Sequence, residues 1–182
     1  FEGEPGDEKS LTYQDLFTQV TQMTAVLRGL GIQRGDRVAI YLPLIPEMVI
    51  AVLACARVGA THSVVFAGFS AESLSSRIND AGARLLITAD GGWRKGEALP
   101  LKNISDQAVA QSPTIEKVLV VRRTGQAVTM NSQRDLWWSD LLNNADVFRG
   151  YPESVSAEHP LFLLYTSGST GKPKGYNMGQ LV

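Results

Sequence analysis

The sequence predicts an α/β fold in which a layered parallel sheet carries helices on both faces. Helical and strand patterns alternate along most of the 182-residue chain. The predicted strands are continuous apolar runs, which is typical of strands that are covered on both sides. Glycine or proline stands at many of the boundaries between these elements, where turns are expected. Apolar residues make up 44% of the chain, which is enough to fill the core of such a sheet.

The first predicted element is a helix with Thr12 as its N-cap and Gly31 as its stop signal. Its apolar residues recur at the spacing of one helical face, and these are Leu16, Val20, Met23, Leu27 and Leu30. A turn at Gly35 and Asp36 then leads into the apolar run 37–42, which we expect to be the first strand.

The second predicted helix is apolar on nearly every side. It begins at Pro46, a residue favoured at the first helical position, runs to Arg57 and ends at Gly59. Because such a helix has no polar face, we expect it to be sandwiched between other layers. The next strand is predicted at 61–66.

The same alternation continues after the second strand. Ser70 is the expected N-cap of a helix that runs through Ile78 and closes at Gly82. The elements expected after it are a strand at 84–88, a short helix at 104–111, a strand at 117–121 and a strand at 161–166. Between the last two strands, Trp137 and Trp138 indicate a short helix with one tryptophan in the core and the other partly exposed.

Composition argues against several kinds of partner. The net charge is −1 and no run of Lys and Arg appears, so binding to nucleic acid is not expected. The apolar run 48–56 is too short to span a bilayer, and the charged start of the chain does not resemble a signal peptide. We therefore expect no membrane partner and a cytoplasmic location. The single cysteine, Cys55, is expected to be an inert packing residue. His62 and His159 have no second ligand at a useful spacing, so no metal site is predicted.

Residues 165–175, Tyr-Thr-Ser-Gly-Ser-Thr-Gly-Lys-Pro-Lys-Gly, carry the strongest functional signal in the chain. They follow the apolar run 161–164, which indicates a buried strand. Three glycines allow the backbone to turn tightly and to expose its N–H groups, while hydroxyls and lysines add donors and positive charge. This inventory suits a polyanion, most plausibly the phosphates of a nucleotide.

Two alternative interpretations of this run are less favoured. A flexible Gly/Ser/Thr linker has a similar composition, but this run directly follows an apolar strand and contains Pro173, which stiffens it. A Walker A loop, as in P-loop kinases and ATPases, needs four residues between its first glycine and its Gly-Lys pair. Here two residues separate Gly168 from Gly171, and a proline follows Lys172 in place of a hydroxyl residue.

Three loops are expected at one edge of the sheet. In an open parallel sheet, ligands bind at the carboxyl ends of the strands. The loops that leave these ends are 66–69, 89–96 and 165–175. Their convergence predicts a binding site at this edge.

The 165–175 run resembles the phosphate-binding signature of the AMP-forming acyl-CoA synthetases, which are adenylate-forming enzymes. Other segments resemble the acetyl-CoA synthetases in particular, with propionyl-CoA synthetase as the near neighbour. These segments are 35–43, 54–60, 62–66, 87–90 and 134–138. The likeness extends from about Thr12 to Gly175. It implies that the chain is part of the large N-terminal domain of these enzymes.

The resemblance implies two half-reactions. ATP and a carboxylate, acetate or propionate, give an acyl-adenylate and pyrophosphate, and the thiol of coenzyme A then displaces AMP. The residues implied to hold the ATP phosphates with their magnesium ion are Thr166, Ser167, Gly168, Ser169, Thr170, Gly171, Lys172 and Lys174. Lys172 is the implied catalytic residue, because its charge would meet the leaving pyrophosphate. The residues implied to hold coenzyme A are Phe66, Gly68, Arg94, Lys95 and Gly96.

Two features depart from the family pattern. The family often has a second basic residue three positions after the one matched by Arg94, but Glu97 stands there. Its carboxylate would repel a phosphate, so either Lys95 substitutes or the contact differs. Residues 176–182 do not resemble the family, so the expected family segment is 1–175, followed by a tail. The segment alone is expected to be inactive, and a nucleotide-binding module without catalysis is the alternative interpretation.

Overall fold

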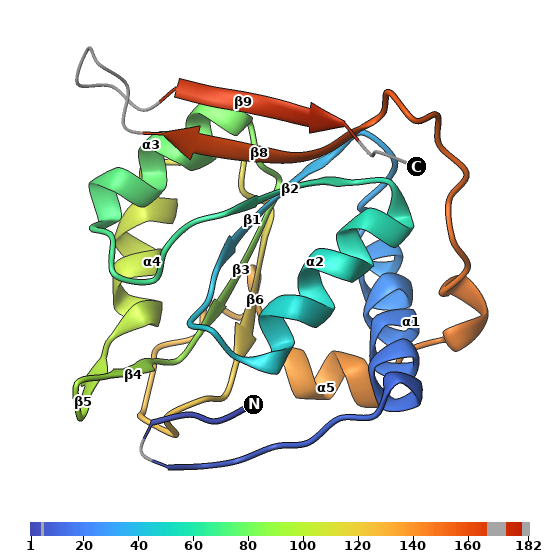
Figure 1. Ribbon diagram of the computed structural model, residues 1–182. Coiled ribbons are helices and arrows are strands. Elements are labelled where there is room, and N and C mark those ends of the chain that lie inside the picture. Colours follow the sequence, from blue (N-terminus) through green and yellow to red (C-terminus); the bar gives the residue numbers. More distant parts are fainter. Residues whose placement is uncertain (5, 167–173, 180–182) are drawn as a thin grey trace.

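A seven-stranded sheet lies at the centre of the molecule (Figure 1). The computed structural model describes residues 1–4, 6–166 and 174–179. The strand order is β7-β6-β3-β1-β2-β8-β9, and all neighbouring pairs are parallel except β8 and β9. The strands of this sheet are β1 (Arg37–Tyr41), β2 (Thr61–Val64), β3 (Leu85–Ala89), β6 (Lys117–Val121), β7 (Asp135–Trp137), β8 (Pro160–Thr166) and β9 (Lys174–Gly179).

Helices cover both faces of the sheet, which confirms the predicted fold class. Helices α1, α2 and α5 lie on one face, and α3 and α4 lie on the other (Figure 1). The helices are α1 (Tyr13–Gly29), α2 (Pro46–Val58), α3 (Ala71–Ala81), α4 (Leu101–Val109), α5 (Trp138–Asn143) and the short 3₁₀-helix η1 (Val147–Arg149). In the described part of the chain, none of the helices combines the length and the apolar character needed to cross a membrane.

The helix ends follow the capping signals in the sequence. Thr12 and Asp15 form a capping box, in which the Asp15 N–H donates to Thr12 Oγ1 over 3.1 Å and the Thr12 N–H donates to Asp15 Oδ2 over 2.9 Å. Ser70 caps α3 as predicted. Gly59 and Gly82 end α2 and α3 with φ angles of 75° and 59°, a left-handed conformation that glycine adopts without steric cost.

The central strands are buried on both faces. Every residue of β3 is buried, and β1 and β6 are buried beyond their first residues. Ile50 of α2 and Leu74 and Ile78 of α3 are fully buried against opposite faces of this sheet. Burying one such side chain contributes roughly 1.5–3 kcal/mol relative to leaving it exposed. This two-sided packing holds the carboxyl ends of the strands, and the loops that leave them, in defined positions.

Several short elements were not predicted. The segment expected to be a loop after β3 contains a hairpin of β4 (Gly92–Arg94) and β5 (Glu97–Leu99), and β7 precedes α5 at one edge of the sheet. Each of these strands has three residues, too few to show the periodicity on which strand prediction depends. The parallel sheet is confirmed for six strands, while β9, which the sequence reading did not include, runs antiparallel to β8.

Element boundaries differ from the predictions by a few residues. Helix α4, predicted at 104–111, begins at Leu101 and ends at Val109. The predicted burial of the tryptophan pair is confirmed, since Trp138 is buried in the core and Trp137 is partly exposed. The predicted helix contains only Trp138, because Trp137 ends strand β7 and α5 begins one residue later.

Candidate functional site

A cleft of about 310 Å³ opens at the carboxyl ends of the central strands. Its walls come from residues 43–45 after β1, 66–68 after β2 and 92–94 in β4, with residues 1–4 at one side. The remaining lining residues are Leu99, Leu101 and Arg123. The predicted convergence of the loops that follow β2 and β3 is therefore confirmed.

Phe66 and Arg94 lie against each other in the lining of this cleft. The guanidinium carbon of Arg94 lies 5.4 Å from the centroid of the Phe66 ring, within the range of a cation–π contact. Phe66 is 57% exposed, and Phe69 packs edge-on against its ring with ring centroids 5.6 Å apart. An exposed aromatic ring beside a guanidinium can stack on a planar base while the guanidinium binds a phosphate.

Gly68 makes this contact sterically feasible. A Cβ atom at this position would lie 2.5 Å from Arg94 Nη1 and would also collide with Phe66 Cε1. Any other residue at position 68 would therefore displace both side chains. The structure brings together three of the five residues predicted to hold coenzyme A.

The other two predicted residues, Lys95 and Gly96, form the turn of the β4–β5 hairpin. Both have a positive φ, 53° and 81°, as a two-residue type I′ turn requires. Arg94 and Glu97 are register partners across the turn, so their side chains lie on the same face of the hairpin. The carboxylate of Glu97 thus stands beside Arg94, and Lys95 adds an exposed cation at the tip of the hairpin.

Arg123 places a second guanidinium in the cleft lining, and the sequence analysis did not identify it. Its Nη1 and Nη2 atoms donate to the carboxylate of Asp7 over 2.6 and 2.9 Å. These hydrogen bonds hold the pKa of Asp7 below its usual value. Arg123 could have been found in the sequence as part of a basic pair, Arg122 and Arg123, directly after the strand at 117–121.

The glycine-rich run connects β8 to β9. Thr166 ends β8 and Lys174 begins β9, and the two are register partners. Because β8 is parallel to β2, the run leaves the sheet at the same edge as the cleft, as predicted. Residues 167–173 lie outside the described residues, and they include Ser167, Gly168, Ser169, Thr170, Gly171 and Lys172 of the predicted phosphate site. The predicted roles in phosphate binding, including those of Thr166 and Lys174, stay predictions.

Helix α3 links the cleft to Tyr165, the first residue of this run. The hydroxyl of Tyr165 donates to Asp80 Oδ2 over 2.7 Å. The Arg77 guanidinium lies 5.6 Å from the ring centroid of Tyr165 and 4.6 Å from that of Phe69, which in turn packs on Phe66. Burial, with the nearby Asp80 carboxylate, raises the pKa of Tyr165, so its hydroxyl remains a donor at neutral pH. A continuous series of contacts thus joins the two predicted binding regions.

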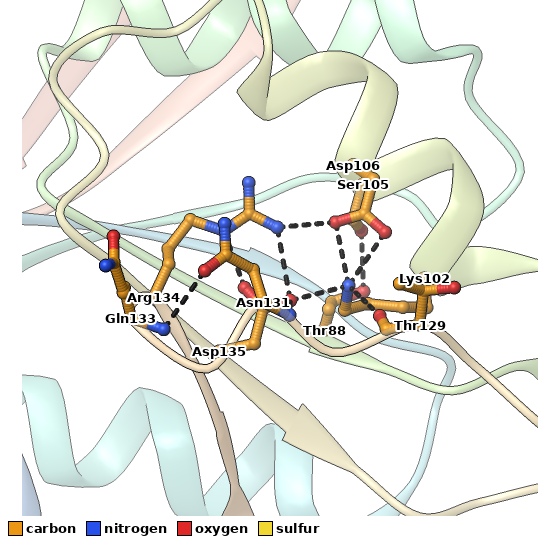
Figure 2. A network of polar contacts seen from close by, with 9 residues as sticks. All are labelled: Thr88, Lys102, Ser105, Asp106, Thr129, Asn131, Gln133, Arg134 and Asp135. Atoms are coloured by element: carbon orange, nitrogen blue, oxygen red, sulfur yellow. Dashed lines mark hydrogen bonds and ion pairs between the residues drawn. The ribbon is translucent and has the colours of Figure 1, made fainter.

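A buried polar network fixes helix α4, which directly follows the hairpin (Figure 2). Lys102 is fully buried, and its Nζ lies 2.7 Å from Asp106 Oδ1 and 2.8 Å from Asp135 Oδ2. Arg134 pairs with the same two carboxylates, over 2.6 Å and 2.5 Å. Burial would raise the pKa of Asp135, but hydrogen bonds from Arg134 and Lys102 outweigh burial and lower it. Because each charge has an opposite partner, we interpret this network as a structural anchor.

The cysteine and the two histidines, for which no ligand role is predicted, are packed or hydrogen-bonded within the protein. Cys55 is buried, and burial raises the pKa of its thiol to about 12. Burial lowers the pKa of His62 to about 4, and its ring lies 5.8 Å from that of Phe162. His159 Nε2 lies 2.8 Å from the carbonyl oxygen of Gly59. Within residues 1–4, 6–166 and 174–179, no three His, Cys, Asp or Glu side chains are grouped so that they could hold a metal ion.

Residues 2–179 match the protein family described as AMP-binding enzyme. The chain is similar to the acetyl-coenzyme A synthetase of Streptomyces avermitilis, with 56% identity over 175 residues that make up 96% of this chain and 27% of that protein. It is 57% identical to the acetyl-coenzyme A synthetase of Mycobacterium bovis over 178 residues, again 96% of this chain and 27% of that protein. Among solved structures, the acetoacetyl-CoA synthetase from Streptomyces lividans matches with a TM-score of 0.86 at 32% identity, covering 96% of this chain and 26% of that chain. The chain therefore spans about a quarter of the length of these proteins.

Proposed function

Since the chain belongs to the family of AMP-binding enzymes, we propose that it is part of an AMP-forming acetate–CoA ligase. The observation that carries this proposal is the cleft in which the exposed Phe66 ring stands beside Arg94, at the sheet edge from which the glycine-rich run departs. The name of the similar proteins, acetyl-coenzyme A synthetase, supports acetate as the acid.

The cleft binds the nucleotide end of coenzyme A in this proposal. The adenine stacks on the exposed face of Phe66, and the Arg94 guanidinium donates to a phosphate. Lys95 adds positive charge from the tip of the hairpin, beside the opposing charge of Glu97. Gly68 and Gly96 act through the backbone, since one leaves space for Arg94 and the other forms the turn.

The glycine-rich run binds the β- and γ-phosphates of ATP. Its backbone N–H groups and hydroxyls surround the phosphates, and Lys172 stabilises the negative charge that develops as pyrophosphate leaves. The described residues offer no acidic cluster for the magnesium ion that the resemblance implies. We therefore assign no step to that ion, which would neutralise phosphate charge when bound.

The proposed reaction has the two half-reactions that the resemblance implies, and in each of them one bond forms and one bond breaks. A carboxylate oxygen of acetate attacks the α-phosphorus of ATP, and the bond from that phosphorus to the pyrophosphate oxygen breaks. The thiolate sulfur of coenzyme A then attacks the acetyl carbon, and the bond to the AMP oxygen breaks. The cleft contributes by holding coenzyme A, which turns the second attack into a reaction between bound partners.

The test uses the full-length synthetase that carries this segment. We expect acetate to support exchange of labelled pyrophosphate into ATP and coenzyme A-dependent release of AMP. A preference for propionate would reassign the acid. If neither acid supports the exchange reaction, the alternative interpretation holds, in which the chain is part of a nucleotide-binding module without catalysis. Substrates of this kind are free small molecules, and we place the enzyme in the cytoplasm without a membrane or nucleic-acid partner.

A further inference from the structure

Asp90 follows β3 directly and joins two loops that contribute an arginine each to the cleft lining, Arg94 and Arg123. It is an ionisable residue with only 1% of its surface exposed, and it is not among the residues that line the cleft. Before it in the chain lies the buried strand β3, and after it comes the hairpin that carries Arg94. The second loop, residues 122–126, follows the neighbouring strand β6 and carries Arg123.

The carboxylate of Asp90 accepts hydrogen bonds from backbone N–H groups of both loops. Its Oδ1 accepts from Gly91 over 2.7 Å, from Arg123 over 2.7 Å and from Thr124 over 3.0 Å. Its Oδ2 accepts from Gly125 over 2.8 Å. Three successive N–H groups of the second loop thus converge on one carboxylate, a geometry that favours a negative charge.

Hydrogen bonds of the Asp90 backbone also connect the hairpin loop to the loop that follows β6. Gln126 Nε2 donates to the carbonyl oxygen of Asp90 over 2.8 Å, and the Asp90 N–H donates to the carbonyl oxygen of Val121 over 2.9 Å. The two loops are packed closely here, because a Cβ atom on Gly91 would lie 2.6 Å from Thr124 Oγ1. Movement of either loop would therefore displace the other.

We infer that Asp90 is a positioning residue for coenzyme A, since it fixes the hairpin that carries Arg94 relative to the turn that carries Arg123. This inference rests on the proposed function of the cleft. Asparagine is the informative substitution, because it keeps the volume of the side chain but replaces one acceptor oxygen by an NH₂ group. That group would face a backbone N–H and leave a buried donor without an acceptor.

The test measures Asp90→Asn in a full-length synthetase that carries this segment. We expect the KM for coenzyme A to rise by up to about tenfold to a hundredfold, the range for loss of a hydrogen bond from Arg94 to a phosphate. The kcat and the acetate-dependent pyrophosphate exchange should change by less than about twofold, because the ATP phosphates bind to a different loop. Leu27→Ala is the control for stability, since Leu27 is fully buried in α1 on the side of the molecule away from the hairpin (Figure 1). It should lower the melting temperature without changing the KM for coenzyme A.

Two further variants decide the interpretation. Gln126→Ala removes the hydrogen bond from Gln126 to the Asp90 carbonyl oxygen but leaves the Asp90 carboxylate in place, so it should raise the KM for coenzyme A by a smaller factor. This variant replaces Asp90→Asn in the test if Asp90→Asn does not fold. Suppose that Arg94→Ala raises the KM for coenzyme A but Asp90→Asn, or its replacement Gln126→Ala, does not. The positioning role of Asp90 is then wrong, and the assignment of the cleft to coenzyme A stands. If Arg94→Ala also leaves the KM unchanged, the proposed function of the cleft fails and this inference fails with it. Equal losses for ATP, acetate and coenzyme A would likewise overturn it, because a general structural defect predicts them.

Discussion

The Arg94 guanidinium lies over the Phe66 ring, 5.4 Å from its centroid, although the two residues come from loops after different strands. The contact exists because β2 and β3 flank β1 in a parallel sheet and release their loops at the same edge. A cation and an exposed aromatic surface are therefore preorganised before any ligand arrives, which would lower the entropic cost of the proposed binding of coenzyme A.

Arg94→Ala, in a full-length synthetase that carries this segment, should raise the KM for coenzyme A by roughly tenfold to a hundredfold. A hydrogen bond to a charged group is worth about 1.5–3 kcal/mol, which corresponds to this range. Pyrophosphate exchange should be nearly unchanged. Arg122→Ala is the matched control, because Arg122 lies over Trp137 at 3.9 Å and does not line the cleft. Equal losses in exchange and in the overall rate would contradict the assignment.

Glu97→Gln should lower the KM for coenzyme A, whereas Lys95→Ala should raise it. Glu97 pairs in register with Arg94, so its charge opposes a phosphate that binds there. Both residues are exposed, and charge effects between exposed groups are about 0.2–1 kcal/mol, so changes of up to about fivefold are expected. The measurement is the KM at low and high ionic strength, because screening should shrink both effects. A Glu97→Gln variant with unchanged KM at low salt would show that this carboxylate does not face the phosphate.

Gly171→Val should slow acyl-adenylate formation more than Lys174→Ala does. A β-branched side chain would crowd the approach of the backbone to the phosphates and restrict the turn. Loss of Lys174 removes one of two lysines and leaves the backbone donors in place. The rate of adenylate formation at saturating ATP, with folding checked by thermal melting, compares the two variants. A larger loss for Lys174→Ala than for a well-folded Gly171→Val would favour binding led by side-chain charge.

The stability of the chain should decrease as the pH falls from about 6.5 towards 4. Burial lowers the pKa of His62 to about 4, so between these values the unfolded chain binds a proton that the folded chain does not. The difference in proton binding predicts that the free energy of unfolding falls by roughly 2 kcal/mol between pH 7 and pH 5. Urea unfolding at both pH values measures it. His62→Gln should flatten this dependence, and His159→Gln should retain it. If His62→Gln kept the full dependence, another group would have to be responsible.

Lys102→Met should destabilise the fold by about 3–5 kcal/mol, because it leaves the buried Asp135 carboxylate with one cation fewer. Lys117→Met is the control, since Lys117 is only partly buried and its ammonium group donates only to the carbonyl oxygen of Gln133 among the described residues. Thermal melting compares the two. Equal and small shifts in melting temperature would mean that the network in Figure 2 contributes little to stability.

Local signals in the sequence were sufficient for most of the architecture. Thr12, Gly59 and Gly82 mark helix ends through side-chain capping and left-handed backbone, both of which depend on residues close in sequence. The hairpin was missed because its turn is Lys95-Gly96, and lysine seldom occupies a position with positive φ.

The parts of the site that depend on distant residues were not visible in the sequence. Asp90 binds N–H groups that lie 33 to 35 residues away, and Arg123 reaches Asp7 across 116 residues. No local periodicity encodes such pairings. The resemblance supplied Phe66, Gly68 and Arg94, and the contact between them is a result of the sheet order.

A crystal structure of a full-length synthetase that carries this segment, grown with coenzyme A, would show whether the cleft binds the nucleotide end of coenzyme A. We expect an adenine ring stacked on Phe66 and a phosphate oxygen within hydrogen-bonding distance of Arg94. Coenzyme A bound elsewhere, with the Phe66–Arg94 contact unchanged and no ligand in the cleft, would contradict it.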